Sequence, residues 1–305
     1  GKIREVVIGT GEKAVKVGGE TCYPFHTFEG EMPNPPRIAM EVYDHVDPAE
    51  WPEAALEPFR DVIGDPAAWA QKCVQEYGAE LIAVQLVSID PNTLNRPSEE
   101  AVETVRKVAE AVDVPIIVWG CGDEEKDAEA LRLVGEALEG RRLAIGPVLD
   151  KNYRQLGATC IAYGHVAIAS TPIDINLAKQ LNILLTELGV PDEQIIMDPT
   201  TGGLGYGIEY TYSVMERMRI AALTQGDEKL AYPIICNMGI EVWKVKEAKI
   251  PEEEMPQMGD PKRRAILMEA ITAKLLLLAG ADILIMRHPE AIRLTKEMMA
   301  ELVAA

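Results

Sequence analysis

Short runs of apolar residues recur along most of the chain, and within a run the apolar residues follow one another without regular polar alternation. Strands of this kind are typical of a parallel sheet that is buried on both faces. Eight runs are predicted as strands: RIAMEVY (37–43), ELIAVQLV (80–87), VPIIVWG (114–120), RLAIGPV (142–148), HVAIAS (165–170), QIIMDP (194–199), YPIICNM (232–238) and DILIMRH (282–288).

Segments with the apolar spacing of a helix lie between these runs. The clearest are 66–78, 98–112, 124–138, 175–189 and 263–280. Two of these helices are expected to begin at side-chain caps, Ser98 and Asp174. Three are expected to end at a left-handed glycine cap, at Gly78, Gly189 and Gly280.

The alternation of strand and helix predicts an α/β protein with a (β/α)8 TIM barrel over residues 37–305. Eight such units match a fold that typically takes about 250 residues. An open doubly wound sheet is the alternative, but it more often carries a GxGxxG motif after its first strand, where this chain reads YDHVDPAEW. Residues 1–36 are predicted to form a short hairpin extension, because REVVIGTG and KAVKVGGE read as two strands around a turn.

Composition excludes several classes of partner. The chain has 49 acidic and 30 basic side chains and a formal net charge of −19, so neither nucleic acid nor an anionic membrane surface is expected to bind it. The apolar run LLLLAGA (275–281) is far shorter than the about 20 residues of a membrane span. Five scattered cysteines without a CxxC pair fit a reducing compartment, and we expect a cytoplasmic protein.

Residues that follow the strands of such a barrel converge on one rim, where binding sites are built. The rim expected here is rich in amides, hydroxyls and carboxylates but poor in cations, which suits an amide-rich or heteroaromatic ligand. The residues predicted to contact a bound cofactor are Asp90, Asn92, Trp119, Asp123, Asn152, Thr171, Asp174, Asp198, Thr200, Thr201, Gly202, Gly203, Met238 and His288.

Four glycines stand in the six positions 202–207, between a predicted strand and a predicted helix. Glycine lets a ligand approach the backbone closely, and free N–H groups at the start of a helix can hold an anion or a carbonyl. A tight turn without a ligand is the alternative. We predict a binding loop.

Some of these residues also have ordinary structural explanations. Asp198 can cap the turn that follows it, and His288 before a proline can be a structural cap. Trp119 can belong to the core, although its ring can also stack on a planar ligand.

Motif searches predict no catalytic residue and no metal site in the chain itself. The four histidines have no HxH or HExxH spacing, and neither a GxSxG elbow nor a DxHxxG cobamide motif occurs. Demanding chemistry is therefore expected to come from a bound cofactor or from another chain.

Two segments resemble signatures of the pterin-binding barrels, the group of dihydropteroate synthases and methyltetrahydrofolate corrinoid methyltransferases. They are YGAELIAVQLVSIDPNTLNRPSEEAVETV (77–105) and IIMDPTTGGLGYG (195–207). A closer resemblance covers nearly the whole chain. PFHTFEGE, WAQKCVQEYGAELI, WGCGDEEKD, DINLAKQLNILLTELG, DPTTGGLGYGIEYTYSVMERMR and LIMRHPEA are similar to the small, or delta, subunits of the corrinoid/iron–sulfur proteins of the acetyl-CoA decarbonylase/synthase pathway.

The second resemblance implies a barrel subunit paired with a large subunit that holds an iron–sulfur cluster and a mobile corrinoid domain. Such a pair carries a methyl group on cobalt from methyltetrahydrofolate, delivered by a separate methyltransferase, to acetyl-CoA synthase in anaerobic CO/CO2 fixation. It implies that the barrel rim caps a corrinoid (cobamide) shared with the large subunit, and that this chain holds no iron–sulfur cluster.

The chain departs from the pterin-binding pattern at two strand ends. Those enzymes use an acidic residue after the third strand and an asparagine after the fourth, where this chain has Trp119 and Pro147, while Asp198 stands in the expected place. The resemblance therefore favours a carrier subunit that is not an enzyme by itself. An active pterin-dependent corrinoid methyltransferase and a structural scaffold with an empty rim are the alternatives.

Overall fold

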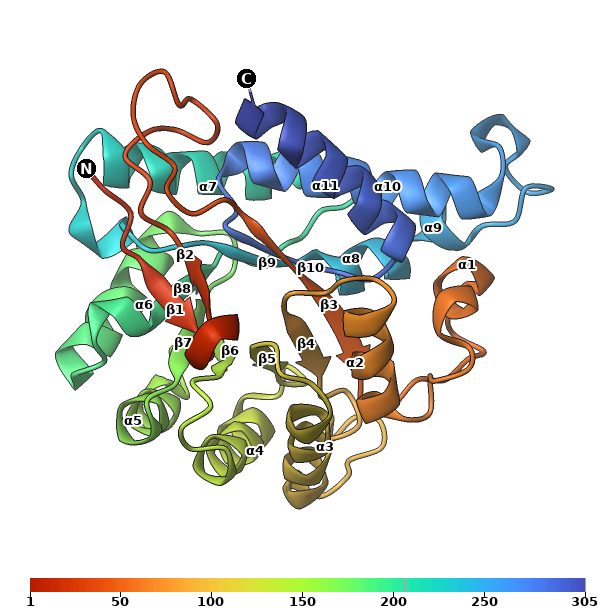
Figure 1. Ribbon diagram of the computed structural model, residues 1–305, viewed down its shortest axis with the longest axis horizontal. Helices are drawn as coiled ribbons and strands as arrows, with labels where there is room; N and C mark the ends of the chain where they lie inside the picture. Colours follow the sequence, from red (N-terminus) through yellow and green to blue (C-terminus); the bar gives the residue numbers. More distant parts are fainter. Residues whose placement is uncertain (206, 305) are drawn as a thin grey trace.

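A computed structural model describes residues 1–205 and 207–304 and shows parallel strands surrounded by helices (Figure 1). The described residues contain an eight-stranded sheet in the order β8-β7-β6-β5-β4-β3-β10-β9, with parallel pairing throughout. Its strands are β3 (Arg37–Tyr43), β4 (Ile82–Gln85), β5 (Ile116–Trp119), β6 (Ala144–Val148), β7 (Val166–Ser170), β8 (Ile195–Asp198), β9 (Ile235–Asn237) and β10 (Ile283–Met286).

The two edges of this sheet meet. Met197 of β8 forms a parallel bridge with Ile234, just before β9, and the Met197 N–H donates to the carbonyl of Pro233 at 2.8 Å. The predicted (β/α)8 barrel is confirmed, and each strand lies within the run predicted for it.

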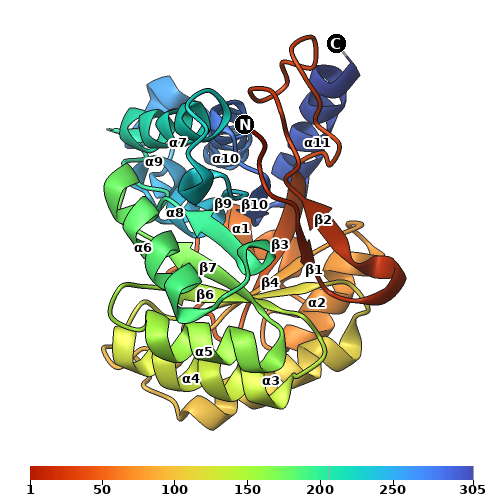
Figure 2. The same cartoon turned by 90° about the vertical axis from the view of Figure 1, so that its left-hand side faces the viewer.

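Helices cover the outside of the barrel (Figures 1 and 2). The α-helices of the described residues are α1 (Glu53–Leu56), α2 (Pro66–Gln75), α3 (Ser98–Ala111), α4 (Glu124–Ala137), α5 (Tyr153–Tyr163), α6 (Ile175–Leu188), α7 (Ile208–Leu223), α8 (Met238–Lys244), α9 (Lys246–Lys249), α10 (Pro261–Ala279) and α11 (Pro289–Ala304). Short 3-10 turns are η1 (Gly11–Lys13), η2 (Glu57–Phe59), η3 (Asp192–Gln194), η4 (Glu228–Leu230) and η5 (Pro256–Met258).

Three of the predicted helix caps are present. Asp174 accepts hydrogen bonds from the N–H groups of Asn176 at 2.7 Å and Leu177 at 3.0 Å, and so caps α6. Gly189 and Gly280 end α6 and α10 in the left-handed conformation that glycine adopts at little cost.

Two predicted caps were wrong. Ser98 is already inside α3, whose capping position is the preceding proline, and its hydroxyl donates to Glu129 of α4 at 2.7 Å. Gly78 has a positive φ of 64°, but α2 ends earlier and Glu76 is its C-cap. Ser98 instead connects α3 to α4, and Gly78 lies in the turn that follows α2.

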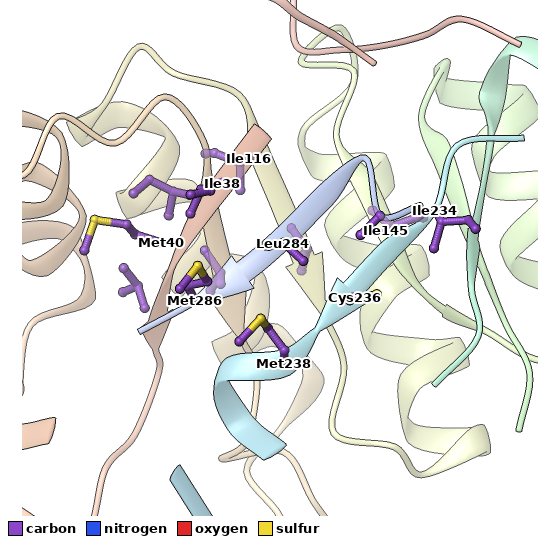
Figure 3. Packing of buried hydrophobic residues seen from close by; sticks show 14 of the residues in the cluster. Ile38, Met40, Ile116, Ile145, Ile234, Cys236, Met238, Leu284 and Met286 are labelled. Atoms are coloured by element: carbon purple, nitrogen blue, oxygen red, sulfur yellow. The ribbon is translucent and has the colours of Figure 1, made fainter. Parts of the chain in front are cut away.

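Side chains alternate along each strand between two buried layers, which explains why the strands show no polar face. Those that point outward pack against the helices, as Ile38, Ile116, Ile145 and Leu284 do (Figure 3). Those that point inward form an inner cluster: Ala39, Leu81, Ala83, Ile117, Ala144, Val166, Ile168, Ile196, Ile235, Ile283 and Ile285.

The N-terminal segment closes one end of the barrel. The predicted hairpin is present as the antiparallel strands β1 (Val6–Ile8) and β2 (Val15–Val17), and all four of their terminal side chains belong to the inner cluster. Gly9 after β1 donates to the carbonyl of Arg142, just before β6, at 2.8 Å. The hairpin therefore shares its hydrophobic core with the amino-terminal ends of the barrel strands.

After β2 the chain continues as residues 18–36, which we call the basal loop. It approaches α7 and α10, and its Tyr23 hydroxyl is hydrogen-bonded to that of Thr224. None of the helices within residues 1–205 and 207–304 is long and apolar enough to cross a membrane.

One buried histidine connects β6, α4 and β7. His165 Nδ1 accepts from the Leu143 N–H at 3.1 Å, and Nε2 lies 2.8 Å from the carbonyl oxygen of Gly135. These two bonds require the neutral imidazole with its proton on Nε2, because Nδ1 must be an acceptor. Burial lowers the pKa of His165.

This histidine predicts a loss of stability on acidification. Because its folded pKa lies below the ordinary value of 6.5, its contribution is present above that pH and is lost as the pH falls. We expect the free energy of unfolding to fall by up to about 1.4 kcal/mol per pH unit below pH 6.5, and less steeply in His165→Gln. Urea unfolding from pH 5 to 8 measures this, with the exposed His26→Gln as control, and equal slopes for all three proteins would contradict it.

Candidate functional site

The inward-pointing side chains change from apolar to polar towards the carboxyl ends of the strands. Residues two positions apart on a strand share a face, so Gln85 follows Ala83 inward and Asp198 follows Ile196. The polar inward side chains at this end, the barrel mouth, are Glu41, Gln85, Ser170, Asp198, Asn237 and Arg287.

One half of the mouth is a closed polar network. Gln85 Nε2 donates to Asn237 Oδ1 at 2.8 Å and to Glu41 Oε2 at 3.2 Å. Arg287 Nε donates to Glu41 Oε1, and Arg287 Nη2 donates to the Tyr43 hydroxyl at 2.7 Å. Since β4 and β9 are not neighbours in the sheet, the bond between Gln85 and Asn237 crosses the barrel interior.

Aromatic rings enclose the buried Arg287. Its guanidinium carbon lies 3.8 Å from the ring centroid of Trp51, 5.1 Å from that of Tyr43 and 6.0 Å from that of Trp243. Such rings attract a cation through their negative faces. The arginine is thus held by an ion pair, a hydrogen bond to tyrosine and stacking.

Glu269 of α10 holds the end of β10 in place. Its carboxylate accepts from the N–H groups of Arg287 at 2.6 Å and His288 at 3.0 Å and from Trp243 Nε1 at 2.9 Å. Burial raises the pKa of Glu269 to about 7, while these donors act against the shift. This carboxyl positions the strand end and is not free for a ligand.

The other half of the mouth has unsatisfied polar groups. Ser170 of β7 and Asp198 of β8 are register partners, and burial raises the pKa of Asp198 to about 6. Asp198 Oδ1 accepts from the Thr200 N–H at 3.0 Å. Within the described residues, the buried hydroxyl of Thr171 has no hydrogen-bond partner, and those of Ser170 and Thr201 lie near Asp198 and Cys236 without a hydrogen bond of good geometry. Because buried polar groups are normally paired, these are the atoms at which water or a ligand is expected.

Trp119 lies between the two halves. It ends β5, pairs in register with Gln85 on one side and Gly146 on the other, and packs on the inner cluster below it. Its side chain remains half-buried. The indole therefore lies on the inner side of β5 at the mouth, with part of its surface exposed.

A cavity of about 420 Å3 adjoins the mouth between the loops after β3 and β4 and the helix α8. Arg287 and its aromatic neighbours line one side of it. Its charged side chains also include Asp47, Glu50, Asp90, Lys244 and Lys249.

The glycine loop after β8 shows two different kinds of glycine. Gly203 has a φ of 73°, and a Cβ there would lie 2.5 Å from the carbonyl oxygen of Gly207. Gly202 has space instead, since the nearest atom to its Cβ would be Ile173 Cδ1 at 3.4 Å. Turn geometry therefore requires glycine at position 203, which agrees with the alternative of a tight turn. At position 202 there is room for a ligand to approach the backbone. Tyr206 within this loop lies outside the described residues.

The side chain of Thr211 on α7 anchors this loop. The Gly202 N–H donates to its hydroxyl oxygen at 3.2 Å, and the same hydroxyl lies 3.3 Å from the carbonyl oxygen of Thr200. Thr200 itself has a positive φ of 61°, and its hydroxyl donates to the carbonyl of Thr171 at 2.8 Å.

Several predicted contact residues are occupied by local structure. Asp90 accepts from the N–H of Asn92 at 2.8 Å and from its Nδ2 at 3.1 Å, which closes a turn. Asp123 accepts from the Lys126 N–H at 2.9 Å and caps α4, as Asp174 caps α6. These carboxylates stabilise loops, so their role as ligand contacts stays a prediction.

Asn152 is buried after β6. Its Oδ1 accepts from the Leu149 N–H at 2.7 Å, while its Nδ2 has no partner within the described residues. The Nδ2 of Asn152 is therefore another unsatisfied donor at the mouth, beside the hydroxyls described above.

Two predicted residues point away from the mouth. Met238 is fully buried in the outer core, beside Met286 and Cys236 (Figure 3), because it follows the inward-pointing Asn237. His288 stacks on Trp243 with centroids 5.8 Å apart and borders an outer groove between α2 and α11. Burial lowers the pKa of His288 to about 4.

The sequence prediction missed the polar network. Glu41, Gln85 and Asn237 lie inside strands, whereas the predicted contacts were the last residues of the runs and the loops that follow them. A signal was present, since each is a lone polar residue near the end of an otherwise apolar run.

Residues 1–205 and 207–304 contain no group of three or more His, Cys, Asp or Glu side chains placed to hold a metal ion. Cys121 lies near the mouth, and burial together with the charge of Asp127 raises its pKa to about 12, so its thiol is protonated at neutral pH.

Comparison with known proteins decides the family. The sequence pattern of the family described as "CO dehydrogenase/acetyl-CoA synthase delta subunit" matches residues 5–302. This chain belongs to that family. Among its relatives is the acetyl-CoA decarbonylase/synthase complex subunit delta of Archaeoglobus fulgidus, 39% identical over 98% of this chain and 68% of that protein. The subunit delta of Methanopyrus kandleri is 40% identical over 95% of this chain and 71% of its own length.

Solved structures support the fold of the delta subunit family. Dihydropteroate synthase from Xanthomonas albilineans with 4-aminobenzoic acid aligns with a TM-score of 0.58 and 13% identity, covering 90% of this chain and 95% of that one. Dihydropteroate synthase from Thermus thermophilus in complex with 6HMPPP gives a TM-score of 0.54 and 14% identity over 99% of both chains. At these identities the likeness shows the barrel fold alone.

The buried ion pair predicts a large cost for removing one partner. In Glu41→Gln, Arg287 remains buried without its carboxylate, and we expect the free energy of unfolding to fall by about 3–5 kcal/mol. Glu57→Gln removes the carboxylate of an exposed pair with Lys262 and should change stability little. Urea unfolding compares the two, and equal effects would contradict the importance of the buried pair.

The glycine loop predicts opposite outcomes for neighbouring positions. Gly203→Ala places a Cβ against a carbonyl at positive φ and should lower the free energy of unfolding by about 1–3 kcal/mol. Gly202→Ala should be tolerated, because its Cβ meets only a side-chain methyl. Thermal unfolding of the two variants measures this. A stable Gly203→Ala protein would show that the turn can adopt another conformation.

Proposed function

We propose that this chain is the barrel subunit of a methyl-carrying corrinoid/iron–sulfur protein and that its mouth caps a corrinoid held together with a large subunit. Its membership of the delta subunit family carries the proposal, because its relatives are named as subunits of an acetyl-CoA decarbonylase/synthase complex. The large subunit, a methyltetrahydrofolate methyltransferase and acetyl-CoA synthase are the proposed partners.

The mouth fits a flat ring that carries amide groups on its edge. Unsatisfied hydroxyls of Thr171 and Thr201 and the Nδ2 of Asn152 lie at the ends of β6 to β8, where they could bind such amides. Trp119 offers a half-buried indole face at the mouth, on which a planar ligand can rest. When bound, the corrinoid supplies the cobalt atom that carries the methyl group.

The residues of this chain would serve as a cover that opens in turn. Trp119 excludes water and oxidants from the face that it covers, and the polar groups around it hold the edge of the ligand. A cover that must open cannot bind too tightly. Changing the ratio of covered to uncovered corrinoid from 99:1 to 1:99 requires about 5.5 kcal/mol of differential binding. A hydrated polar rim binds weakly enough for a change of that size to release the corrinoid.

One observation favours an alternative, an active pterin-dependent corrinoid methyltransferase. Asp198 keeps its place at the end of β8, and buried hydroxyls without partners adjoin it. Against it, Trp119 and the buried Pro147 stand at the two positions where polar pterin contacts were expected.

A bulky substitution on the rim tests the proposal. In the pair with the large subunit, loaded with cobalamin and reduced, we expect Asn92→Trp to raise the rate at which an external oxidant attacks cobalt by about tenfold, which corresponds to about 1.4 kcal/mol of lost docking. Glu139→Trp, exposed just beyond the far end of α4, is the matched control and should leave the rate unchanged.

A methyl-transfer assay and the oxidation rate together separate the carrier subunit from the methyltransferase and the scaffold. Saturable methyl transfer from methyltetrahydrofolate to free cobalamin by this chain alone, abolished in Asp198→Asn, would establish the methyltransferase instead. An unchanged oxidation rate in Asn92→Trp together with no transfer would leave the chain as a scaffold and overturn the proposal.

A further inference from the structure

A cluster of charged groups is buried at the end of the barrel opposite the mouth. It consists of Glu20 on the basal loop, Arg219 on α7 and Asp282 just before β10. The three line a cavity of about 10 Å3, which is close to the room that one water molecule needs. The other walls are mainly apolar and include Pro24, Phe25, Met32, Pro36 and Leu277.

On the barrel side of this cluster the charges are paired. Arg219 donates to the Asp282 carboxylate, to the carbonyl of Gly280 at 2.6 Å and to the carbonyl of Tyr232 at 3.1 Å. Asp282 Oδ2 also accepts from the Ile234 N–H at 2.6 Å. The arginine and the aspartate therefore satisfy each other and the surrounding backbone.

Glu20 is different, because neither of its carboxyl oxygens has a hydrogen-bond partner within the described residues although the residue is only 5% exposed. Its backbone carbonyl accepts from the Ile3 N–H at 2.9 Å, which ties the basal loop to the start of the chain. An ionised carboxylate here would lose its hydration without gaining a partner.

The groups that face Glu20 do not compensate its charge. Burial first, and then the charge of Asp282, raise the pKa of Glu20 to about 9, while Arg219 acts in the opposite direction. The Cys22 thiol on the same loop adds no cation, and burial and the charge of Glu20 raise its pKa in turn.

We propose that Glu20 is a proton-operated latch, in which a proton on its carboxyl group holds the basal loop against α7 and the start of β10. The protonated carboxyl can donate a hydrogen bond to the Asp282 carboxylate, which turns a repulsive pair into an attractive one. Loss of the proton places two carboxylates side by side in an apolar cavity and loosens the loop.

The direction of the pH dependence follows from where the proton is bound. In a released loop Glu20 titrates near its ordinary pKa of 4.5, whereas in the docked loop it keeps its proton up to about pH 9. The docked state thus contains one more proton between these values. Docking is strongest below pH 4.5, weakens about tenfold per pH unit as the pH rises, and levels off above about pH 9. Neutral pH lies inside this window.

Hydrogen exchange of the full chain tests the latch. We expect the protection of amides in residues 18–36, corrected for the intrinsic exchange rate, to fall about tenfold per unit between pH 6 and 9. Glu20→Gln, which is neutral at every pH, should show constant protection. Glu31→Gln alters an exposed carboxylate of the same loop and should keep the wild-type slope.

An infrared spectrum at pH 7 gives a second readout that does not depend on the loop's opening. The difference spectrum between the wild type and Glu20→Gln should contain the band of one protonated carboxylic acid, and so should the difference between Glu31→Gln and Glu20→Gln. Bands from Glu269 and Asp198, whose pKa values are about 7 and about 6, are common to the three proteins and cancel. Protection that does not vary with pH in the wild type, or a full slope that persists in Glu20→Gln, would overturn the proposal. If Glu20→Gln fails to fold, the wild-type pH profile decides the question together with the carboxylic acid band that remains at pH 8, above the pKa of Glu269 and below that of Glu20.

Discussion

The ion pair between Glu41 and Arg287 is the contact on which the barrel mouth depends. It joins the first and last strands of the barrel, β3 and β10, at their carboxyl ends. Burying two charges is favourable only if their remaining donors and acceptors are satisfied. The pair is hydrogen-bonded to Gln85 and Tyr43, and aromatic rings surround the arginine. Together these contacts hold four strands in register. This half of the mouth is therefore rigid and self-contained, whereas the hydroxyls at the ends of β7 and β8 are left for water or a ligand.

The opposite end of the barrel is closed by a different means. The hairpin of β1 and β2 inserts its four terminal valine and isoleucine side chains beneath the inner cluster, so the barrel interior has no exposed apolar end there. Beside it the buried Glu20, whose carboxyl oxygens have no hydrogen-bond partner in the part of the chain that the structure describes, attaches the basal loop. At the mouth the buried Glu41 carboxylate is paired with Arg287. At the base Arg219 is already paired with Asp282, and the carboxyl of Glu20 makes the docking of the basal loop respond to pH. The two ends thus differ in how they handle buried charge, although both are covered by the same layer of helices.

Residues of the mouth were only partly predictable from sequence. Asp90, Asp123 and Asp174 were expected to face a ligand because they follow strands, yet each is bonded within its own loop or helix end. Aspartate serves both purposes in loops, and nothing local distinguishes them. Trp119 is a different case. Its place at the strand end was evident, but only the pairing of β5 with its neighbours shows that the ring points inward and packs on the inner cluster.

The sequence by itself determined the eight strands, five of the helices that cover the barrel, the N-terminal hairpin and the family. These depend on apolar spacing and local turn chemistry, which act over a few residues and extend along the whole chain. Tertiary structure decided which polar atoms are satisfied and which remain free. Gln85 and Asn237 bond across the barrel although they stand 152 residues apart, and Glu20 meets Asp282 only because the basal loop folds beneath the last strand. These contacts form only when the barrel closes and brings distant segments together. The spacing of residues along one segment therefore cannot predict them.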